Sequence, residues 1–265
     1  MTLTRSTVSG NSSRSLGGGI DNGTGGTLTL IHSTISGNHT TVGGGGLVSW
    51  GPLTITNSTI SDNIAYYAGG VLNHHAADVT HSTFSDNHAN WGGGISNFAP
   101  LTITNSTFSG NSAGVHSGGI DNTAGGTLTV IHSTFTGNSA PTGGGIYNQG
   151  STVTMRHSII ANSPSGGNCD GWGTINDAGY NLDSESTCGF SAAGSLSNTA
   201  PLLGPLANNG GSTRTHALLE GSPAINGGDP AFQPGSVLWD QRGAGFPRRV
   251  GARIDIGAVE RRGQP

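Results

Sequence analysis

The fold is decided by one stretch of sequence, Leu101-Thr102-Ile103-Thr104-Asn105-Ser106-Thr107-Phe108-Ser109-Gly110-Asn111, which is followed by Ser117-Gly118-Gly119-Ile120-Asp121-Asn122. This stretch is one copy of a unit that recurs over most of the first 165 residues. An [Ile/Phe/Val]-x-x-Asn element returns every 24 to 27 residues, with its Asn at Asn11, Asn38, Asn63, Asn87, Asn111, Asn138 and Asn162. A Gly-Gly-[Ile/Leu/Val] element keeps the same step, with its apolar residue at Ile20, Leu47, Val71, Ile95, Ile120 and Ile146. A fixed period in this range is typical of a solenoid or a repeat array.

Apolar and polar residues alternate within each unit, as in Leu53-Thr54-Ile55-Thr56. Alternation with many β-branched residues predicts short, half-buried strands, and no segment has a helical period. Strands this short cannot form a core alone, but similar units stacked in register would bury a continuous apolar column. The sequence therefore predicts an all-β fold, a single-stranded right-handed parallel β-helix, whose hand follows the rule for parallel crossovers.

Stacked turns also place identical side chains above one another. We expect one interior file of large apolar residues and one ladder of amides that bond along the column. The expected apolar file is Ile35, Ile60, Phe84, Phe108 and Phe135, and the expected ladder is Asn22, Asn73, Asn97, Asn122 and Asn148, with Ser49 as its exception.

The chain divides into three parts. Residues 1–162 hold the turns of the β-helix. Residues 163–200 interrupt the pattern and contain Cys169 and Cys188, which either form a disulfide or stay free thiols; an exported protein favours the disulfide. Residues 201–265 combine apolar patches with Pro, Gly and Arg. We expect them to form a C-terminal cap over the last apolar layer, with Arg242 paired to a nearby carboxylate.

The beginning of the chain aligns with the middle of a repeat. Met1 to Val8 corresponds to Leu53 to Ile60, and no signal peptide is visible in the sequence. We therefore expect an N-terminally truncated β-helix that lacks further turns and an export signal.

Composition limits the function classes. The 265 residues include 48 Gly and no Lys, only 9% are charged, and the net charge is −4. No Arg lies between Arg14 and Arg156, so the repeat lacks the cations that nucleic-acid binding requires. No run of 18 apolar residues occurs, so we expect no transmembrane segment.

The most suggestive pair of side chains is Asp62 and Asp86, which occupy the same position on adjacent turns. Stacked carboxylates about 5 Å apart could serve a retaining glycosidase or hold Ca²⁺. The structural alternative is a turn with positive φ, because Gly10, Gly37, Gly110 and Gly137 share this position. The residues that complete this candidate glycan or calcium contact are His88, Tyr66, Tyr67 and Trp91; we name no catalytic residue and no other metal site.

Two further columns have alternative interpretations. His32, His81, His132 and His157 share a position with Asn57 and Asn105, which favours a corner hydrogen bond over a metal ladder. An outward column could bind ice or a crystalline polysaccharide, although Thr is also common on solvated strands. Its members are Thr7, Thr34, Thr59, Thr83, Thr107 and Thr134.

Two segments resemble known families. Phe108-Ser109-Gly110-Asn111 and Gly92-Gly93-Gly94-Ile95 resemble the FxxN and GGxI repeats of polymorphic outer-membrane proteins and related bacterial adhesin-like β-helices. The tail resembles the choice-of-anchor Q region of secreted bacterial β-helix proteins, through Cys169, Tyr180-Asn181-Leu182-Asp183, Cys188-Gly189-Phe190, Asp240 to Gly243 and Asp255 to Glu260. The resemblance implies a right-handed parallel β-helix, export and surface display or release, and no defined reaction.

These observations predict a non-catalytic secreted or cell-surface β-helix that acts as an adhesin-like, structural or binding module, outside the cell or on its surface. A carbohydrate-binding or carbohydrate-active β-helix, similar to a polysaccharide lyase or hydrolase, is the alternative, and an ice-binding solenoid is a minor one. Expected partners are glycans or host and cell-surface molecules. We expect no cofactor except Ca²⁺ at the carboxylate pair. Fold alone does not establish an activity.

Overall fold

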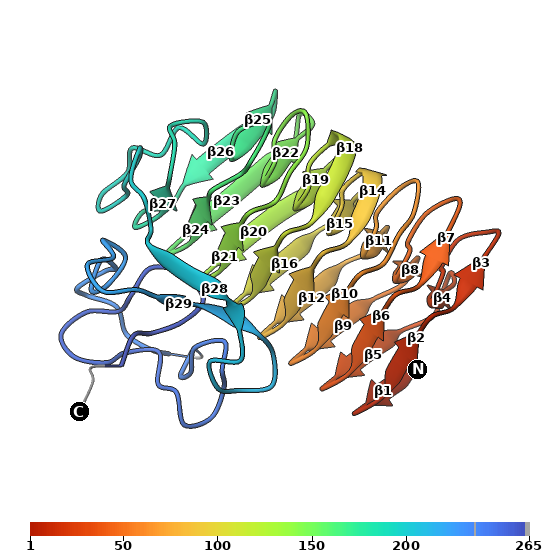
Figure 1. Cartoon of the computed structure of the whole chain (residues 1–265), viewed down its shortest axis with the longest axis horizontal. Coiled ribbons are helices and arrows are strands. Elements are labelled where there is room, and N and C mark those ends of the chain that lie inside the picture. The colour runs from red at the N-terminus through yellow and green to blue at the C-terminus, as the bar shows by residue number, and fades with distance from the viewer. Residues whose placement is uncertain (236, 263–265) are drawn as a thin grey trace.

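Three parallel sheets run the length of the molecule and enclose its core (Figure 1). The computed structural model describes residues 1–235 and 237–262, so Ser236 and residues 263–265 of the expected cap lie outside the described residues. Successive turns contribute one strand to each sheet, and every neighbouring pair within the three sheets is parallel. The prediction of an all-β parallel solenoid is confirmed, and the described part of the chain contains no helix.

The strands are named by sheet, in the order in which they pair. The first sheet contains β1 (Thr2–Thr4), β5 (Leu28–Ile31), β9 (Leu53–Thr56), β12 (Ala77–Thr80), β16 (Leu101–Thr104), β20 (Thr127–Ile131), β23 (Thr152–Arg156) and β26 (Thr174–Asp177). The second sheet contains β2 (Thr7–Ser9), β6 (Thr34–Ser36), β10 (Thr59–Ser61), β13 (Thr83–Ser85), β17 (Thr107–Ser109), β21 (Thr134–Thr136), β24 (Ile159–Ala161) and β27 (Leu182–Asp183). The third sheet contains β4 (Ile20–Asn22), β8 (Leu47–Ser49), β11 (Val71–Asn73), β15 (Ile95–Asn97), β19 (Ile120–Asn122), β22 (Ile146–Asn148) and β25 (Cys169–Gly171).

Three short pairs complete the secondary structure. Two are parallel pairs between the second and third sheets, and the third is an antiparallel hairpin near the C-terminus. These pairs are β3 (Ser12–Ser13) with β7 (His39–Thr40), β14 (His88–Trp91) with β18 (Ser112–His116), and β28 (Leu203–Ala207) with β29 (Thr215–Leu218).

The interior file of the second sheet forms as the sequence predicts. Ile35 pairs with Ile60, Ile60 with Phe84, and Phe84 with Phe108, and all are fully buried. The ring centroids of Phe84 and Phe108 are 4.6 Å apart, and those of Phe108 and Phe135 are 4.5 Å apart. Because every turn covers the apolar side of its neighbour, the core is one continuous column.

The predicted amide ladder of the third sheet also forms. Nδ2 of Asn73 donates to Oδ1 of Asn97 at 2.8 Å, and the same bond joins Asn97 to Asn122 and Asn122 to Asn148, each at 2.9 Å. At the predicted exception, Oγ of Ser49 accepts from Nδ2 of Asn22 at 2.8 Å. The ladder therefore satisfies buried polar groups along the solenoid axis, except beside Ser49, where the buried Oδ1 of Asn73 has no partner among the described residues.

A second ladder joins the Asn residues that define the repeat, but Asn162 does not belong to it. The side-chain amides bond in sequence from Asn11 to Asn138. Assigning Asn162 to this series was wrong by one residue, because Ile160, not Ile159, pairs with Phe135. Asn162 is therefore exposed at the corner position of Gly137, with a φ of 56°.

The sheets continue beyond the boundary expected at residue 162. β25, β26 and β27 add a further turn, and the predicted disulfide joins Cys169 to Cys188 within it. Both cysteines and Phe190 belong to the same buried cluster as the interior file. Residues between 169 and 190 thus contribute to the end of the core.

Residues 201–262 lie along the side of the solenoid, whereas we expected a cap over its last layer. Leu218, Ala224, Ile256 and Val259 pack with Ile159 on the outer side of the second sheet. In Figure 1 the β28–β29 hairpin and the loops that follow it lie beside the turns. The apolar outward residues of β24 explain this position, since they offer a surface that the earlier turns lack. We call residues 201–262 the C-terminal arm.

Candidate functional site

Asp62 and Asp86 occupy the corners that follow β10 and β13, each with a φ of 57°. The predicted positive-φ turn is thus confirmed at both positions. Burial, then repulsion from Asp62, raises the pKa of Asp86. A Cβ on Gly110 would lie 2.7 Å from Oδ1 of Asp86, so this carboxylate leans toward the next turn.

The predicted glycan or calcium contact divides into separate groups. Tyr66, Tyr67 and Trp91 meet, with centroids 4.9 Å apart for the two tyrosines and 4.8 Å apart for Tyr67 and Trp91. The cavity that Tyr67 and Trp91 line contains neither Asp62 nor Asp86. His88 is exposed, and its Nδ1 lies 2.9 Å from Oγ of Ser112. The aromatic side chains lie together, as their positions in the repeat predict. The carboxylate pair does not line the same cavity.

That cavity is part of a groove on the outer face of the third sheet. The central residues Ser96 and Asp121 of β15 and β19 form its floor, whereas the central residues Val48 and Leu72 of earlier strands are buried in a small apolar cluster. Bridges between turns align one wall, which runs Tyr67, Trp91, His116. The other wall follows the ends of the strands and runs Trp50, His74, Phe98, Thr123, Gln149. We call this feature the aromatic groove.

The rings of the second wall stack on one another. The centroids of Trp50 and His74 are 3.8 Å apart with planes 4° apart, and those of His74 and Phe98 are 4.8 Å apart. The series stops at Phe98, because the next residue in the column is Thr123. A cavity of about 350 Å³ lies at this point, between Trp91 and Phe98 and over Asp121.

Asp121 is the carboxyl group of the groove floor. It is 2% exposed, and its Oδ1 accepts a hydrogen bond from Nε2 of Gln149 at 2.7 Å. Burial raises the pKa of Asp121 to about 6, although the bond from Gln149 opposes this shift. Polar groups that fix the orientation of a ligand, set among aromatic side chains, are typical of small-molecule sites.

A larger hollow of about 670 Å³ lies at the end of the solenoid. Glycine backbone and the Cys169–Cys188 disulfide form much of its lining, and Asp170 and Thr187 are its polar side chains. It offers fewer groups that could orient a ligand than the aromatic groove does.

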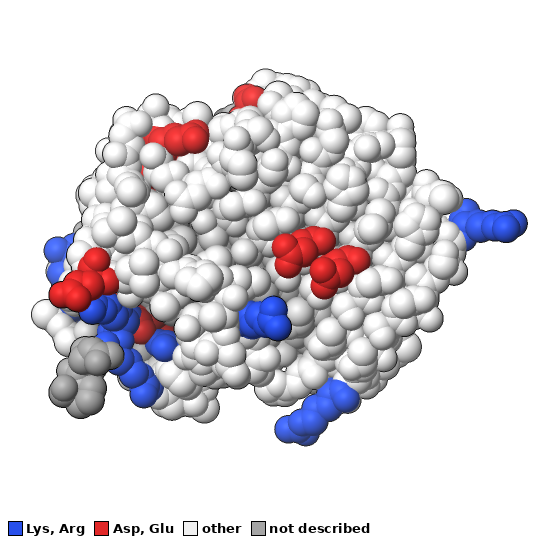
Figure 2. Space-filling view, viewed as in Figure 1, with Lys and Arg blue, Asp and Glu red and all other residues white. Residues whose placement is uncertain are grey.

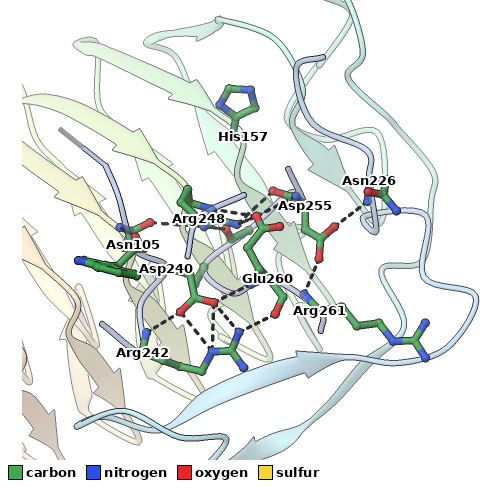
Figure 3. Close-up of polar contacts among 12 residues, drawn as sticks. Asn105, His157, Asn226, Asp240, Arg242, Arg248, Asp255, Glu260 and Arg261 are labelled. Carbon is green, nitrogen blue, oxygen red and sulfur yellow. Dashed lines mark hydrogen bonds and ion pairs between the residues drawn. The ribbon is translucent and has the colours of Figure 1, made fainter. Parts of the chain in front are cut away.

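A buried polar network fixes the C-terminal arm to the turns (Figure 3). Arg248 is fully buried and donates from Nε to Oε1 of Glu260 at 2.9 Å and from Nη1 to the carbonyl of Gly257 at 2.8 Å. The prediction that Arg242 pairs with a carboxylate is confirmed, since it contacts Asp240 at 2.5 Å. Oδ1 of Asn105 on the solenoid accepts from Nη1 of Arg248 at 3.4 Å.

Glu260 titrates in an unusual range. Burial raises its pKa to about 7, while the charge of Arg248 opposes that shift. Each side chain of this network already bonds to another part of the arm or to the solenoid. The network therefore holds the arm on the solenoid.

The arm covers part of the predicted threonine array. Thr83 donates to the carbonyl of Arg214 at 2.6 Å, Thr107 donates to Oε1 of Gln241 at 2.6 Å, and Thr134 accepts from the Ala258 amide at 3.0 Å. These hydroxyls are buried, so the flat outward column is interrupted after its first three members.

The corner column of His and Asn has positive φ throughout, between 46° and 51° for His32, His81, His132, His157, Asn57 and Asn105. The rings of His132 and His157 stack with centroids 4.7 Å apart, and burial lowers the pKa of His157 to about 4. No group of three or more potential metal-binding side chains occurs among residues 1–235 and 237–262.

Charged groups are sparse on the face that Figure 2 shows, where a small acidic cluster lies near the middle of a largely uncharged surface. Within the part of the chain that the structure describes, no helix has the length and apolar character needed to cross a bilayer.

Two segments of the chain match a known repeat. Residues 81–97 and 132–149 are similar to the Chlamydia polymorphic membrane protein repeat. The first segment spans β13, β14 and β15, and the second spans β21 and β22, so each follows a turn from the His corner through the third sheet. The chain therefore contains polymorphic-membrane-protein-like β-helix repeats. Comparisons with curated proteins and with solved structures found no match.

Proposed function

We propose that this chain is a cell-surface β-helix that acts by binding rather than by catalysis, with glycans as its ligand class. The observation that carries the proposal is the similarity of two of its turns to the polymorphic membrane protein repeat, within a continuous parallel solenoid. A surface location fits the disulfide, because disulfides persist in oxidising compartments.

The aromatic groove supports binding as the activity. It is lined by aromatic side chains on two columns, and its buried carboxyl group is Asp121. A retaining or inverting glycosidase needs a pair of carboxyl groups across the scissile bond. Among the lining residues of the cavity between Trp91 and Phe98, only Asp121 has a carboxyl group.

Surface labelling of intact native cells tests the location. An antibody against the folded chain should stain cells without permeabilisation, and added protease should remove the signal. Staining that requires permeabilisation would contradict a surface role.

Binding of the protein to a glycan array, followed by turnover assays on every glycan that binds it, tests the activity. We expect the protein to bind at least one glycan class, with no release of reducing ends and no unsaturated product. Measured turnover would replace the binding proposal with the carbohydrate-active alternative. No retention on the array would remove glycans as the ligand class.

A further inference from the structure

One wall of the aromatic groove lacks a ring at a single position. Trp50, His74 and Phe98 stack on consecutive turns, and Thr123 follows where the spacing of the column calls for another flat side chain. The exposed face of Phe98 therefore looks onto a space that a ring could fill, and the cavity of about 350 Å³ lies there. A volume of this size falls at the lower end of ligand sites, which span roughly 300 to 1,000 Å³.

Hydrogen-bonding groups lie along the floor of that space. Gln149 holds Oδ1 of Asp121 at 2.7 Å, and among the described residues nothing else bonds to the Asp121 carboxyl. The Asp121 Oδ2 and the Gln149 amide are thus an acceptor and a donor that are bonded to each other in the cavity that Phe98 also lines. Their mutual bond fixes both side chains before any ligand arrives, which lowers the ordering cost of binding.

The charges of the cavity select among ring-shaped ligands. Its lining residues include the carboxyl group of Asp121 and no Arg or Lys. An anionic ring would bring its charge next to Asp121 with no compensating Arg or Lys. A pyranose ring without charge has an apolar face for Phe98 and hydroxyl groups for Asp121 and Gln149.

We propose that the gap above Thr123 binds one neutral pyranose ring, stacked on Phe98 and hydrogen-bonded to Asp121 and Gln149. The inference rests on the proposed function only in its ligand class, and it deepens that function by naming the site and the kind of sugar. A longer neutral glycan would place one of its residues in the gap and continue along the groove.

Saturation-transfer NMR and titration with methyl glycosides of neutral hexoses test the gap in the full chain. The key variant is Thr123→Phe, which supplies the missing ring within the column. We expect it to weaken the tightest neutral glycoside at least tenfold, and Phe98→Ala to do the same. Trp50→Ala changes the same column three turns from the gap, so it should leave the Kd of a monosaccharide within twofold.

Folding is checked by the melting temperature and by retention of the disulfide, so that a loss of binding in an unfolded variant is not counted. If Thr123→Phe fails to fold, Ala124→Phe at the exposed neighbouring position serves the same purpose. Tighter binding of a methyl uronoside or of adenosine than of every neutral hexoside would overturn the proposal. Unchanged affinity in both Phe98→Ala and the ring-filling variant would overturn it too.

The outcome is separable from that of the proposed function. If the array glycans bind the wild type and the gap variants equally well, the gap assignment fails and glycan binding stands. If a methyl glycoside binds in the gap while antibody stains only permeabilised cells, the gap assignment stands and the surface role fails.

Discussion

At the scale of single residues, Asp121 is a titratable group placed where ionisation is costly. Its pKa is raised to about 6 by burial, above the value of 3.8 for an accessible Asp. The folded state therefore keeps its proton between roughly pH 4 and 6 while the unfolded state loses it, so this group's contribution to stability falls as pH rises through that window. Asp121→Asn should remove the penalty.

The measurement is urea unfolding of both proteins at pH 4 and at pH 8. We expect Asp121→Asn to be more stable than the wild type by about 3 kcal/mol at pH 8, since its pKa rises from 3.8 to about 6 and one pKa unit corresponds to about 1.4 kcal/mol. Most of this advantage should disappear at pH 4. Asp78→Asn, at an exposed position of β12, should show no such difference. An equal gain for Asp121→Asn at both pH values would contradict the buried ionisation.

Asn87 tests what the repeat asparagines contribute. Its Nδ2 donates to the Ile60 carbonyl and to Oδ1 of Asn111, both at 2.9 Å, and its Oδ1 accepts from the amide and side chain of Asn63. Asn87→Ala leaves the backbone amide of Asn63 without its partner and removes one of two bonds from Nδ2 of Asn63 and from Oδ1 of Asn111, and a buried group left unpaired costs on the order of 1 to 3 kcal/mol. We therefore expect a loss of about 3 kcal/mol in the free energy of unfolding. Asn11→Ala, at the exposed end of the same ladder, should cost less than about 1 kcal/mol. If both variants lose the same free energy of unfolding, a buried Asn of the ladder contributes no more than the exposed Asn11 does.

At the scale of the elements, the Gly-Gly pair before each strand of the third sheet from β4 to β22 sets how closely the turns approach. A Cβ on Gly119 would lie 2.2 Å from the carbonyl oxygen of Gly145 on the next turn, and backbone cannot move away as a flexible side chain could. Gly119→Ala should therefore lower the free energy of unfolding by about 3 kcal/mol or more.

The control for this substitution is Gly23→Ala in the turn after β4, where an added Cβ meets no atom within 4 Å. It should change stability by less than about 1 kcal/mol, measured by chemical denaturation beside Gly119→Ala. A similar small effect at both positions would mean that the turns can separate at the Gly-Gly pair without loss.

The period of the sequence predicts the sheets well because stacking repeats one environment on every turn. Phe84, Phe108 and Phe135 fall in one file since the strand that carries each has the same place in its unit. The reasoning failed at Asn162, where Ile159 and Ile160 are both apolar and only the pairing of Ile160 with Phe135 decides the register. The reasoning from the period also missed the last turn. There Cys169 stands in place of the Ile of the Gly-Gly-Ile element, so the element cannot be seen in the sequence.

The aromatic groove was only half predictable for a related reason. The sequence singles out Tyr66, Tyr67 and Trp91, but only because they lie near Asp62 and Asp86 in the repeat. Trp50, His74 and Phe98 directly follow the ladder position of the third sheet, and that shared offset was the signal that would have found the second wall. Asp121 gave no such signal, because the corresponding residues of neighbouring turns are Ser96 and Tyr147.

At the scale of the whole molecule, the arm has no repeat, so its position could not be read from a period. Its contacts join residues more than a hundred positions apart, as between Thr107 and Gln241 or between Asn105 and Arg248. The expected pairing of Arg242 was found because its partner Asp240 is local. The expected cap was misplaced because the sequence does not show that the outer side of β24 is apolar enough to receive the arm.

The Arg248–Glu260 pair should decide whether this arm stays docked. Arg248→Met leaves the Glu260 carboxyl group, 1% exposed, without its cation, and breaking a buried pair from one side costs about 3 to 5 kcal/mol. The double variant Arg248→Met/Glu260→Gln removes the ionisable group, whose pKa burial raises further once the Arg248 charge is gone, so it should recover more than half of that loss. Hydrogen exchange should show the loss as faster exchange in β28 and β29, while β9 and β12, which the arm does not hold in register, keep their protection. Equal acceleration in the arm and in those turns would contradict a separately docked arm, because it would mean that arm and solenoid unfold as one cooperative unit.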